Sequence, residues 1–293
     1  MSMRLTPLTD LEAGSTSHRL AWLAAGADGA PVGSAYLRLF TREGQRHLAE
    51  LQIAVHGAEL RRGVGSRLLE AAVAAARAEG RRSVIAQAEA GSPADLFLAA
   101  RGFRRVLTLT YARLPLAEAD LMAVEKRARR PCPGYRLTEW DGTVPAELAQ
   151  SYAGSRRAMD DMPMEDTDFG TVVWDVERVV GAAEAVARRG ELLHTVAAMD
   201  VSDGSVVGFS ELVVPGDGRG DAQHYGTAVL PEHRGRGLAR WMKAASILRA
   251  RERHPLLAGL LTDTAQSNAP MLAVNDALGY VPTHQAVEYQ LDL

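Results

Sequence analysis

Two segments of the chain alternate apolar and polar positions as strands do, and each precedes a glycine-rich turn and a helix-like pattern. The segments are residues 48–55 and 222–230, with helices expected over 66–79 and 240–253. One face of the first segment is wholly apolar: Ala49, Leu51, Ile53 and Val55. In the second segment, alternation predicts one mixed face of Gln223, Tyr225, Thr227 and Val229, with His224 opposite. The repeated order of strand, turn and helix indicates a duplicated unit.

The two turns are similar in sequence. They read Leu60-Arg61-Arg62-Gly63-Val64-Gly65 and Arg234-Gly235-Arg236-Gly237-Leu238-Ala239. Glycines let the backbone approach a ligand, and the amides of a first helical turn bind anions. Arginines add charge-assisted contacts to phosphate. We therefore expect two pyrophosphate-binding elements.

Two other phosphate-binding motifs fit less well. A P-loop needs Gly-Lys-Ser/Thr, which neither turn contains. A dinucleotide-binding turn follows the first strand of a βαβ unit, whereas each turn here follows the fourth strand of a mostly antiparallel run. The context therefore disfavours both alternatives.

The repeat extends through both halves of the chain. Each half is expected to contain a strand, a helical region, three antiparallel strands, the turn and its helix, then strand, helix and strand. The final strands are 106–114 and 286–293. The predicted fold class is α/β (α+β), with two tandem domains, each a mixed, mostly antiparallel sheet flanked by helices. The expected domains are 1–115 and 135–293, joined by a linker over 116–134 that ends in Pro131-Cys132-Pro133-Gly134.

Composition restricts the class of protein. The 293 residues carry a formal charge of −3 and are 47% apolar, which is ordinary for soluble domains and gives no reason to expect nucleic acid. The single Cys132 excludes an internal disulfide and fits a reducing compartment. No apolar run is long enough to span a membrane, so we expect a cytoplasmic monomer or homodimer. The spacing of His194 and His233 predicts no metal site.

These motifs resemble the GNAT superfamily of acetyl-CoA dependent N-acetyltransferases. The family's Arg-x-x-Gly-x-Ala/Gly turn is matched in the C-terminal half by Arg234, Gly237 and Ala239. In the N-terminal half, Gly63 and Gly65 match, but Leu60 stands where the first Arg or Gln is expected. The resemblance covers both halves, in a tandem arrangement similar to that of the mycothiol synthases.

The resemblance implies acetyl-CoA as cosubstrate. The fourth strand is expected to separate from the fifth at a bulge and admit the pantetheine arm, beside Val229 and Leu230. The pyrophosphate would lie on the amides of residues 234–239. Asn268 would either contact the pantetheine or cap the next helix. The corresponding coenzyme residues of the N-terminal half would be Val55, Arg62, Gly63, Val64 and Gly65.

The implied chemistry is direct acetyl transfer to a primary amine. Many family members use a tyrosine four residues before the glycine of the Leu-Gly-Phe/Tyr segment, but Asn275 and Leu98 stand there. Leu98 cannot donate a proton, so the N-terminal half is expected to be non-catalytic. Tyr225 and Gln223 precede Thr227 at spacings the family uses for catalytic groups. Glu211, on the neighbouring strand, is a candidate for guiding a water or binding the substrate ammonium.

The acceptor is expected to be a small cationic metabolite. Asp160 and Asp161 begin an acidic loop, 160–168, where the family places its substrate loop, and Gln223 is assigned to the same pocket. A solvated loop is the alternative. A coenzyme-binding regulatory protein without turnover also stays open, because both tyrosine positions are substituted. A thioesterase is disfavoured, since no nucleophile or strong base stands at a convincing position.

Overall fold

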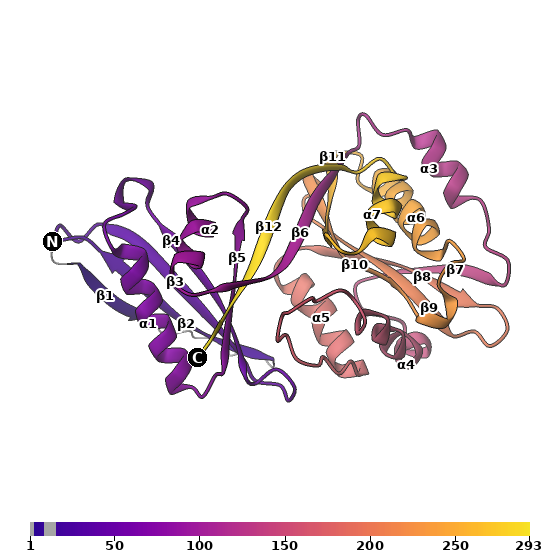
Figure 1. Ribbon diagram of the computed structural model, residues 1–293. Coiled ribbons are helices and arrows are strands. Elements are labelled where there is room, and N and C mark those ends of the chain that lie inside the picture. The colour runs from indigo at the N-terminus through magenta and orange to yellow at the C-terminus, as the bar shows by residue number, and fades with distance from the viewer. Residues whose placement is uncertain (1–2, 9–15) are drawn as a thin grey trace. The chain divides into compact units, whose positions relative to one another are not determined.

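The computed structural model describes residues 3–8 and 16–293 and divides the chain into two compact units. Unit 1 contains the described residues up to Thr108, together with Met164–Val172 and Gln285–Leu293. Unit 2 contains Leu109–Pro163 and Val173–His284. Figure 1 labels the elements of both units.

Unit 1 is a mixed sheet with helices. Its sheet order is β1-β2-β3-β4-β5-β12, in which β4 and β5 are parallel and the other described pairs are antiparallel. The elements are β1 (Arg4–Leu8), β2 (Ser17–Ala25), β3 (Pro31–Phe40), β4 (Leu48–Val55), η1 (Gly57–Glu59), α1 (Val64–Ala78), β5 (Ser83–Glu89), α2 (Pro93–Ala100) and the second part of β12 (Val281–Asp292). The helical region expected between β1 and β2 falls on residues 9–15, which lie outside the described residues.

Unit 2 repeats this plan. Its sheet order is β6-β11-β10-β9-β8-β7, with β10 and β11 parallel. The elements are the second part of β6 (Arg104–Pro115), α3 (Leu121–Ala128), β7 (Tyr135–Asp141), α4 (Ala146–Ser155), η2 (Arg156–Met159), α5 (Val176–Arg188), β8 (Leu192–Asp200), β9 (Val206–Val214), β10 (Gly220–Val229), η3 (Pro231–His233), α6 (Leu238–Arg253), β11 (Leu257–Ala265) and α7 (Ala269–Asp276). The predicted mixed α/β class and tandem repeat are confirmed.

The last strand of each half pairs within the sheet of the other half. In unit 1, residues 286–292 of β12 pair antiparallel with residues 83–89 of β5. In unit 2, residues 109–115 of β6 pair antiparallel with residues 259–265 of β11. The units therefore differ from the expected ranges 1–115 and 135–293 at these strands, because each terminal strand completes a sheet begun by the other half.

Strand β9 lies in the core of unit 2. All nine residues of β9 are buried, because helices cover both of its faces. Phe209 belongs to the cluster that contains Tyr152 of α4, and Leu212 to the cluster that contains Ile247 of α6. Figure 1 shows α4 and α5 below this sheet and α6 and α7 above it. Burial of each such side chain contributes about 1.5–3 kcal/mol.

Candidate functional site

A glycine turn leads from β10 into α6. Gly235 and Gly237 have backbone φ angles of 75° and 81°, a region that residues other than glycine rarely adopt. A Cβ at either position would meet no atom within 4 Å among the described residues, so backbone conformation is what requires glycine. Gly237 is the N-cap of α6 without a side-chain cap, and the first turn carries no acidic residue. The amides of this first turn, at Leu238 and Ala239, therefore have no side-chain cap from the N-cap residue, which is the local geometry that the predicted anion site requires.

The arginines of this turn bind protein groups. Arg234 Nε donates to Val229 O at 2.8 Å, and its Nη2 donates to Asp161 Oδ1 at 2.7 Å. Arg236 donates to the Tyr135 hydroxyl. Arg234 thus joins the end of β10 to the loop after η2, and its guanidinium lowers the pKa of Asp161. The backbone amides, rather than these two side chains, are the groups left for a phosphate.

The parallel strands β10 and β11 separate part-way along their length. Their pairing runs from Gly220 with Leu257 to Gln223 with Leu261, after which β10 continues to Val229 and β11 to Ala265. The separation implied by the family resemblance is therefore confirmed. The Leu230 amide donates to Val207 O at 2.9 Å, so that amide is already satisfied.

A bulge at Tyr225 changes which side chains of β10 share a face. His224 pairs with Leu212 and Gly226 with Glu211, which leaves Tyr225 as the extra residue. His224 and Thr227 therefore lie on the same side as Leu212 and α6. Gln223 and His224 lie on opposite faces, as predicted. The prediction that Thr227 and Val229 share the Gln223 face was wrong, because the extra residue shifts the phase of the later residues by one.

Glu211 lies in a buried ion pair on the other face of the sheet. Its Oε1 accepts from the Tyr152 hydroxyl at 2.5 Å and from Arg156 Nη2 at 2.5 Å. The Arg156 guanidinium also stacks over the rings of Trp174 and Phe209, 4.5 and 4.4 Å from their centroids. Burial, and then the Glu211 charge, raise the pKa of Tyr152 well above its usual value.

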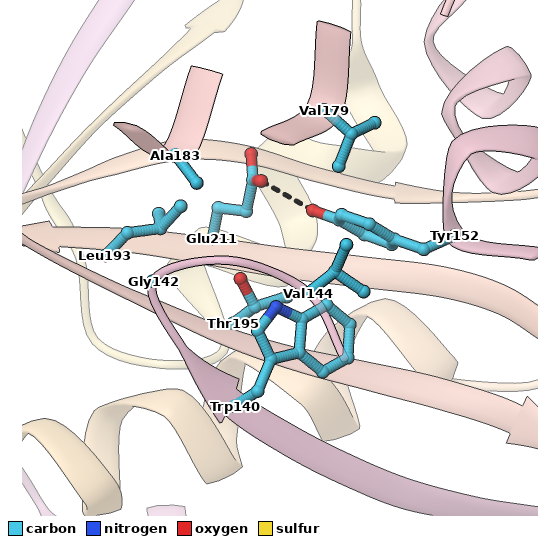
Figure 2. A pocket seen from close by; sticks show the side chains of 9 residues that line it. All are labelled: Trp140, Gly142, Val144, Tyr152, Val179, Ala183, Leu193, Thr195 and Glu211. Carbon is cyan, nitrogen blue, oxygen red and sulfur yellow. Dashed lines mark hydrogen bonds between the residues drawn. The ribbon is translucent and has the colours of Figure 1, made fainter. Parts of the chain in front are cut away.

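A small pocket surrounds the Glu211 carboxylate, and Figure 2 shows the Tyr152 hydroxyl pointing toward it. Helices α4 and α5 and strands β7, β8 and β9 contribute its walls, which are mostly apolar. The lining residues are Trp140, Gly142, Val144, Tyr152, Val179, Ala183, Leu193, Thr195 and Glu211. The pocket contains a single carboxylate and the Thr195 hydroxyl among mostly aromatic and aliphatic side chains.

The other predicted substrate and catalytic residues of β10 have separate partners. Tyr225 is half exposed, and its hydroxyl accepts from Arg189 Nη2 at 2.7 Å. Gln223 Nε2 donates to Asp263 Oδ1 at 3.3 Å. Tyr225 and Glu211 are thus held by different arginines.

The acidic loop is divided between the units. Asp160 is exposed at the end of η2, and Asp161 binds Arg234, both in unit 2. Asp168 belongs to unit 1, where its amide donates to Gln290 Oε1 at 2.8 Å. Only the first part of the loop therefore lies with the turn of unit 2.

Asn268 and Asn275 are both engaged. The Asn268 side chain accepts from the Met271 amide at 3.2 Å and caps α7, the alternative left open by the sequence. Asn275 is buried, accepts from Lys243 Nζ at 2.6 Å and donates to Thr264 Oγ1 at 3.0 Å. The sequence analysis did not identify Lys243, Arg156 or Tyr152 as site residues. Only Lys243 is conspicuous in the sequence, because the chain has just two lysines.

The corresponding turn of unit 1 has a different environment. Gly63, with φ of 83°, is the N-cap of α1, and Arg62 pairs with Glu59 at 3.1 Å. The ring of Phe97 lies within 3.5 Å of where a Cβ on Gly65 would stand. Val64 is buried beneath this turn, and Val55, at the end of β4, pairs with Gly33. Strands β4 and β5 also separate, after Leu51 and Ala86.

Two features are absent from the described residues, 3–8 and 16–293. No group of three or more His, Cys, Asp or Glu side chains among them is arranged to hold a metal ion. No helix in this part of the chain is long and apolar enough to cross a membrane.

Comparison with known proteins identifies the family. The sequence profile of the acetyltransferase (GNAT) family matches residues 4–103 and 136–280, and the chain belongs to this family of acetyltransferases. The family uses acetyl-CoA as cosubstrate. A comparison with curated proteins finds no significant match.

Several solved structures share the fold. A tandem GNAT protein from the clavulanic acid biosynthesis pathway, without acetyl-CoA, is 24% identical with a TM-score of 0.79, over 96% of this chain and 84% of that one. A GCN5-related N-acetyltransferase from Sphaerobacter thermophilus is 15% identical with a TM-score of 0.64, over 93% of this chain and 80% of that one. At these identities, the likeness concerns the fold, here the tandem arrangement.

Proposed function

We propose that unit 2 binds acetyl-CoA and transfers its acetyl group directly to a primary amine of a small cationic metabolite. The observation that carries this proposal is the uncapped start of α6, directly after the strand that parts from β11. An amide-lined turn holds a pyrophosphate, and a strand with an unpaired edge takes an extended pantetheine as an additional β-partner. The residues of this site therefore fit the coenzyme.

The acceptor would enter on the side of α4 and α5. Asp160 supplies an exposed carboxylate there, and Glu211 a buried one that is already paired with Arg156 and would act by positioning rather than by free charge. The pocket around Glu211 is lined mostly by apolar and aromatic side chains. Asp161 is already neutralised by Arg234, so in this proposal it shapes the loop more than it attracts the amine. In this proposal Tyr225 and Gln223 of β10, which are not among the residues that line this pocket, contact the acceptor outside it.

Unit 1 is proposed to be a non-catalytic scaffold. Leu98 stands at the position of a proton donor, is buried, and belongs to an apolar cluster with Phe103 and Tyr289. The strand before the Gly63 turn presents Ala49 and Leu51, both buried, to the same cluster. Such a face offers no group for proton transfer.

A regulatory protein that binds acetyl-CoA without turnover is the second candidate. It is favoured by Asn275 and Leu98, since neither side chain is an acid. The test is release of free thiol from acetyl-CoA, followed with and without a panel of small amines. Amine-dependent release together with acetylated amine supports the proposed transfer. Release without any amine indicates a thioesterase, and binding with no release in any mixture indicates the regulatory protein.

A further inference from the structure

A buried lysine lies on the α6 side of the unit 2 sheet. Lys243, the sixth residue of α6, is 1% exposed. Its Nζ donates to Asn275 Oδ1 at 2.6 Å and to Thr262 Oγ1 at 3.4 Å. Of the 33 lysines and arginines in the chain, only two are lysines. The other lysine, Lys126, is exposed. A buried ammonium is costly, so its retention here calls for a reason.

The Lys243 amine lies at the level where β10 and β11 part. Thr262, its second partner, directly follows Leu261, the last residue of β11 that pairs with β10. On β10, His224 follows the paired Gln223 and faces α6, because it pairs with Leu212, which packs against α6. The amine therefore lies beside the residues at which the two strands begin to separate.

Titratable groups face the amine from several elements. His224 comes from β10, and Tyr280 is the residue before β12, with its ring centroid 4.6 Å from Lys243 Nζ. Asp263 of β11 lies on the opposite face, where it accepts from Gln223, and it acts on the amine only through its charge. The Tyr280 hydroxyl is buried and has no hydrogen-bond partner in the part of the chain that the structure describes. Burial lowers the pKa of Lys243 to about 7, against a raising effect of Asp263. Burial, and then the Lys243 charge, lower the pKa of His224 well below its usual value.

We propose that Lys243 is the proton donor to the departing sulfur in acetyl transfer, with Asn275 holding its amine in place. The inference rests on the proposed function of unit 2. As the carbon–sulfur bond breaks, the sulfur takes the bonding electron pair and Lys243 gives it one proton. The new carbon–nitrogen bond belongs to the acceptor, whose amine loses a proton to solvent. The neutral Lys243 then takes a proton from solvent, so the cycle balances. A donor that titrates near neutral pH is suited to this task.

Proximity can be tested without turnover. With carbon-13-labelled lysine, the protein has only two lysine side chains to observe by NMR, and Lys126 is the internal control. Free CoA, which carries the thiol and cannot react, is added until calorimetry shows saturation. We expect the Lys243 signal to shift and the Lys126 signal to stay. An unchanged Lys243 signal at saturation would overturn the donor role, whereas no calorimetric binding at all would overturn the proposed function itself.

The catalytic role is tested with Lys243→Met and the matched control Lys126→Met. Thiol release by the wild-type protein should fall as pH rises through about 7, because the donor loses its proton. Lys243→Met should lower kcat by about 100-fold or more, remove that decline with pH, and leave CoA affinity unchanged. Lys126→Met should behave as wild type. A folded Lys243→Met protein with the wild-type pH profile contradicts the proposal, as does formation of acetyl-lysine at residue 243, which would make the lysine a nucleophile.

Discussion

Arg156 and Glu211 form a buried ion pair in unit 2, with Arg156 Nη2 2.5 Å from Glu211 Oε1 and both side chains less than 10% exposed. Three aromatic rings, those of Tyr152, Trp174 and Phe209, surround the guanidinium. The pair fixes the one carboxylate of the Figure 2 pocket in a single orientation. The Tyr152 hydroxyl is the third group of this cluster, because it donates to the same Glu211 oxygen.

Removal of one partner of this pair should be strongly destabilising. Arg156→Met leaves an unpaired buried carboxylate, and we expect the free energy of unfolding to fall by about 3–5 kcal/mol in chemical denaturation. The control is Arg38→Met in unit 1, which breaks the Arg38–Glu50 pair, where both side chains are more than a third exposed. That change should cost less than about 1 kcal/mol. If Arg156→Met and Arg38→Met lowered the free energy of unfolding equally, burial would not be what makes the Arg156–Glu211 pair important for stability.

The two acidic residues of the unit 2 loop should affect the acceptor differently. Asp161 is paired with Arg234, whereas Asp160 is exposed at the end of η2. Asp160→Asn should therefore raise KM for cationic amines about two- to fivefold, with a larger effect at low salt. Asp161→Asn should change KM less and should instead weaken the loop–turn contact. If Asp161→Asn has the larger effect on KM, the acceptor competes with Arg234 for Asp161.

The pH dependence of stability should reveal Lys243. Its pKa is about 7 in the folded protein and near 10.5 when unfolded. Between these values the unfolded chain binds more protons, so the free energy of unfolding should rise with pH by at most about 1.4 kcal/mol per unit. Below about pH 7 this group is protonated in both states and its contribution no longer changes. Lys243→Met should remove the rise, and Lys126→Met should retain it; parallel curves for wild type and Lys243→Met would exclude a neutral buried amine.

The turns and helices could be predicted because their signals are local. Glycines at 63, 235 and 237 have positive φ, and both helices start directly after such a glycine, two residues earlier than expected. These features depend on short stretches of chain, so the sequence pattern suffices.

The remaining features depend on long-range packing. Nothing in the alternation of 222–230 marks Tyr225 as a bulge, since the extra residue is defined by its pairing with β9. The pairing of residues 286–292 with β5 likewise depends on a strand far away in the sequence. Arg156 reads as an ordinary surface residue until Glu211 and the aromatic rings are placed around it.

The central claim is that the turn at Gly237, rather than the one at Gly63, holds the coenzyme. Gly237→Leu and Gly63→Leu place the same side chain at equivalent N-caps with φ of 81° and 83°, so the backbone strain is matched. The side chain at 237 should block the approach of a pyrophosphate to the amides of α6. Unfolding curves for both variants establish that each is folded.

Calorimetric titration of these two variants with CoA is the most direct measurement. We expect Gly237→Leu to lose CoA binding and Gly63→Leu to bind as the wild-type protein does. Wild-type affinity in a folded Gly237→Leu protein, with loss of binding in Gly63→Leu, would place the coenzyme in unit 1 and contradict the account.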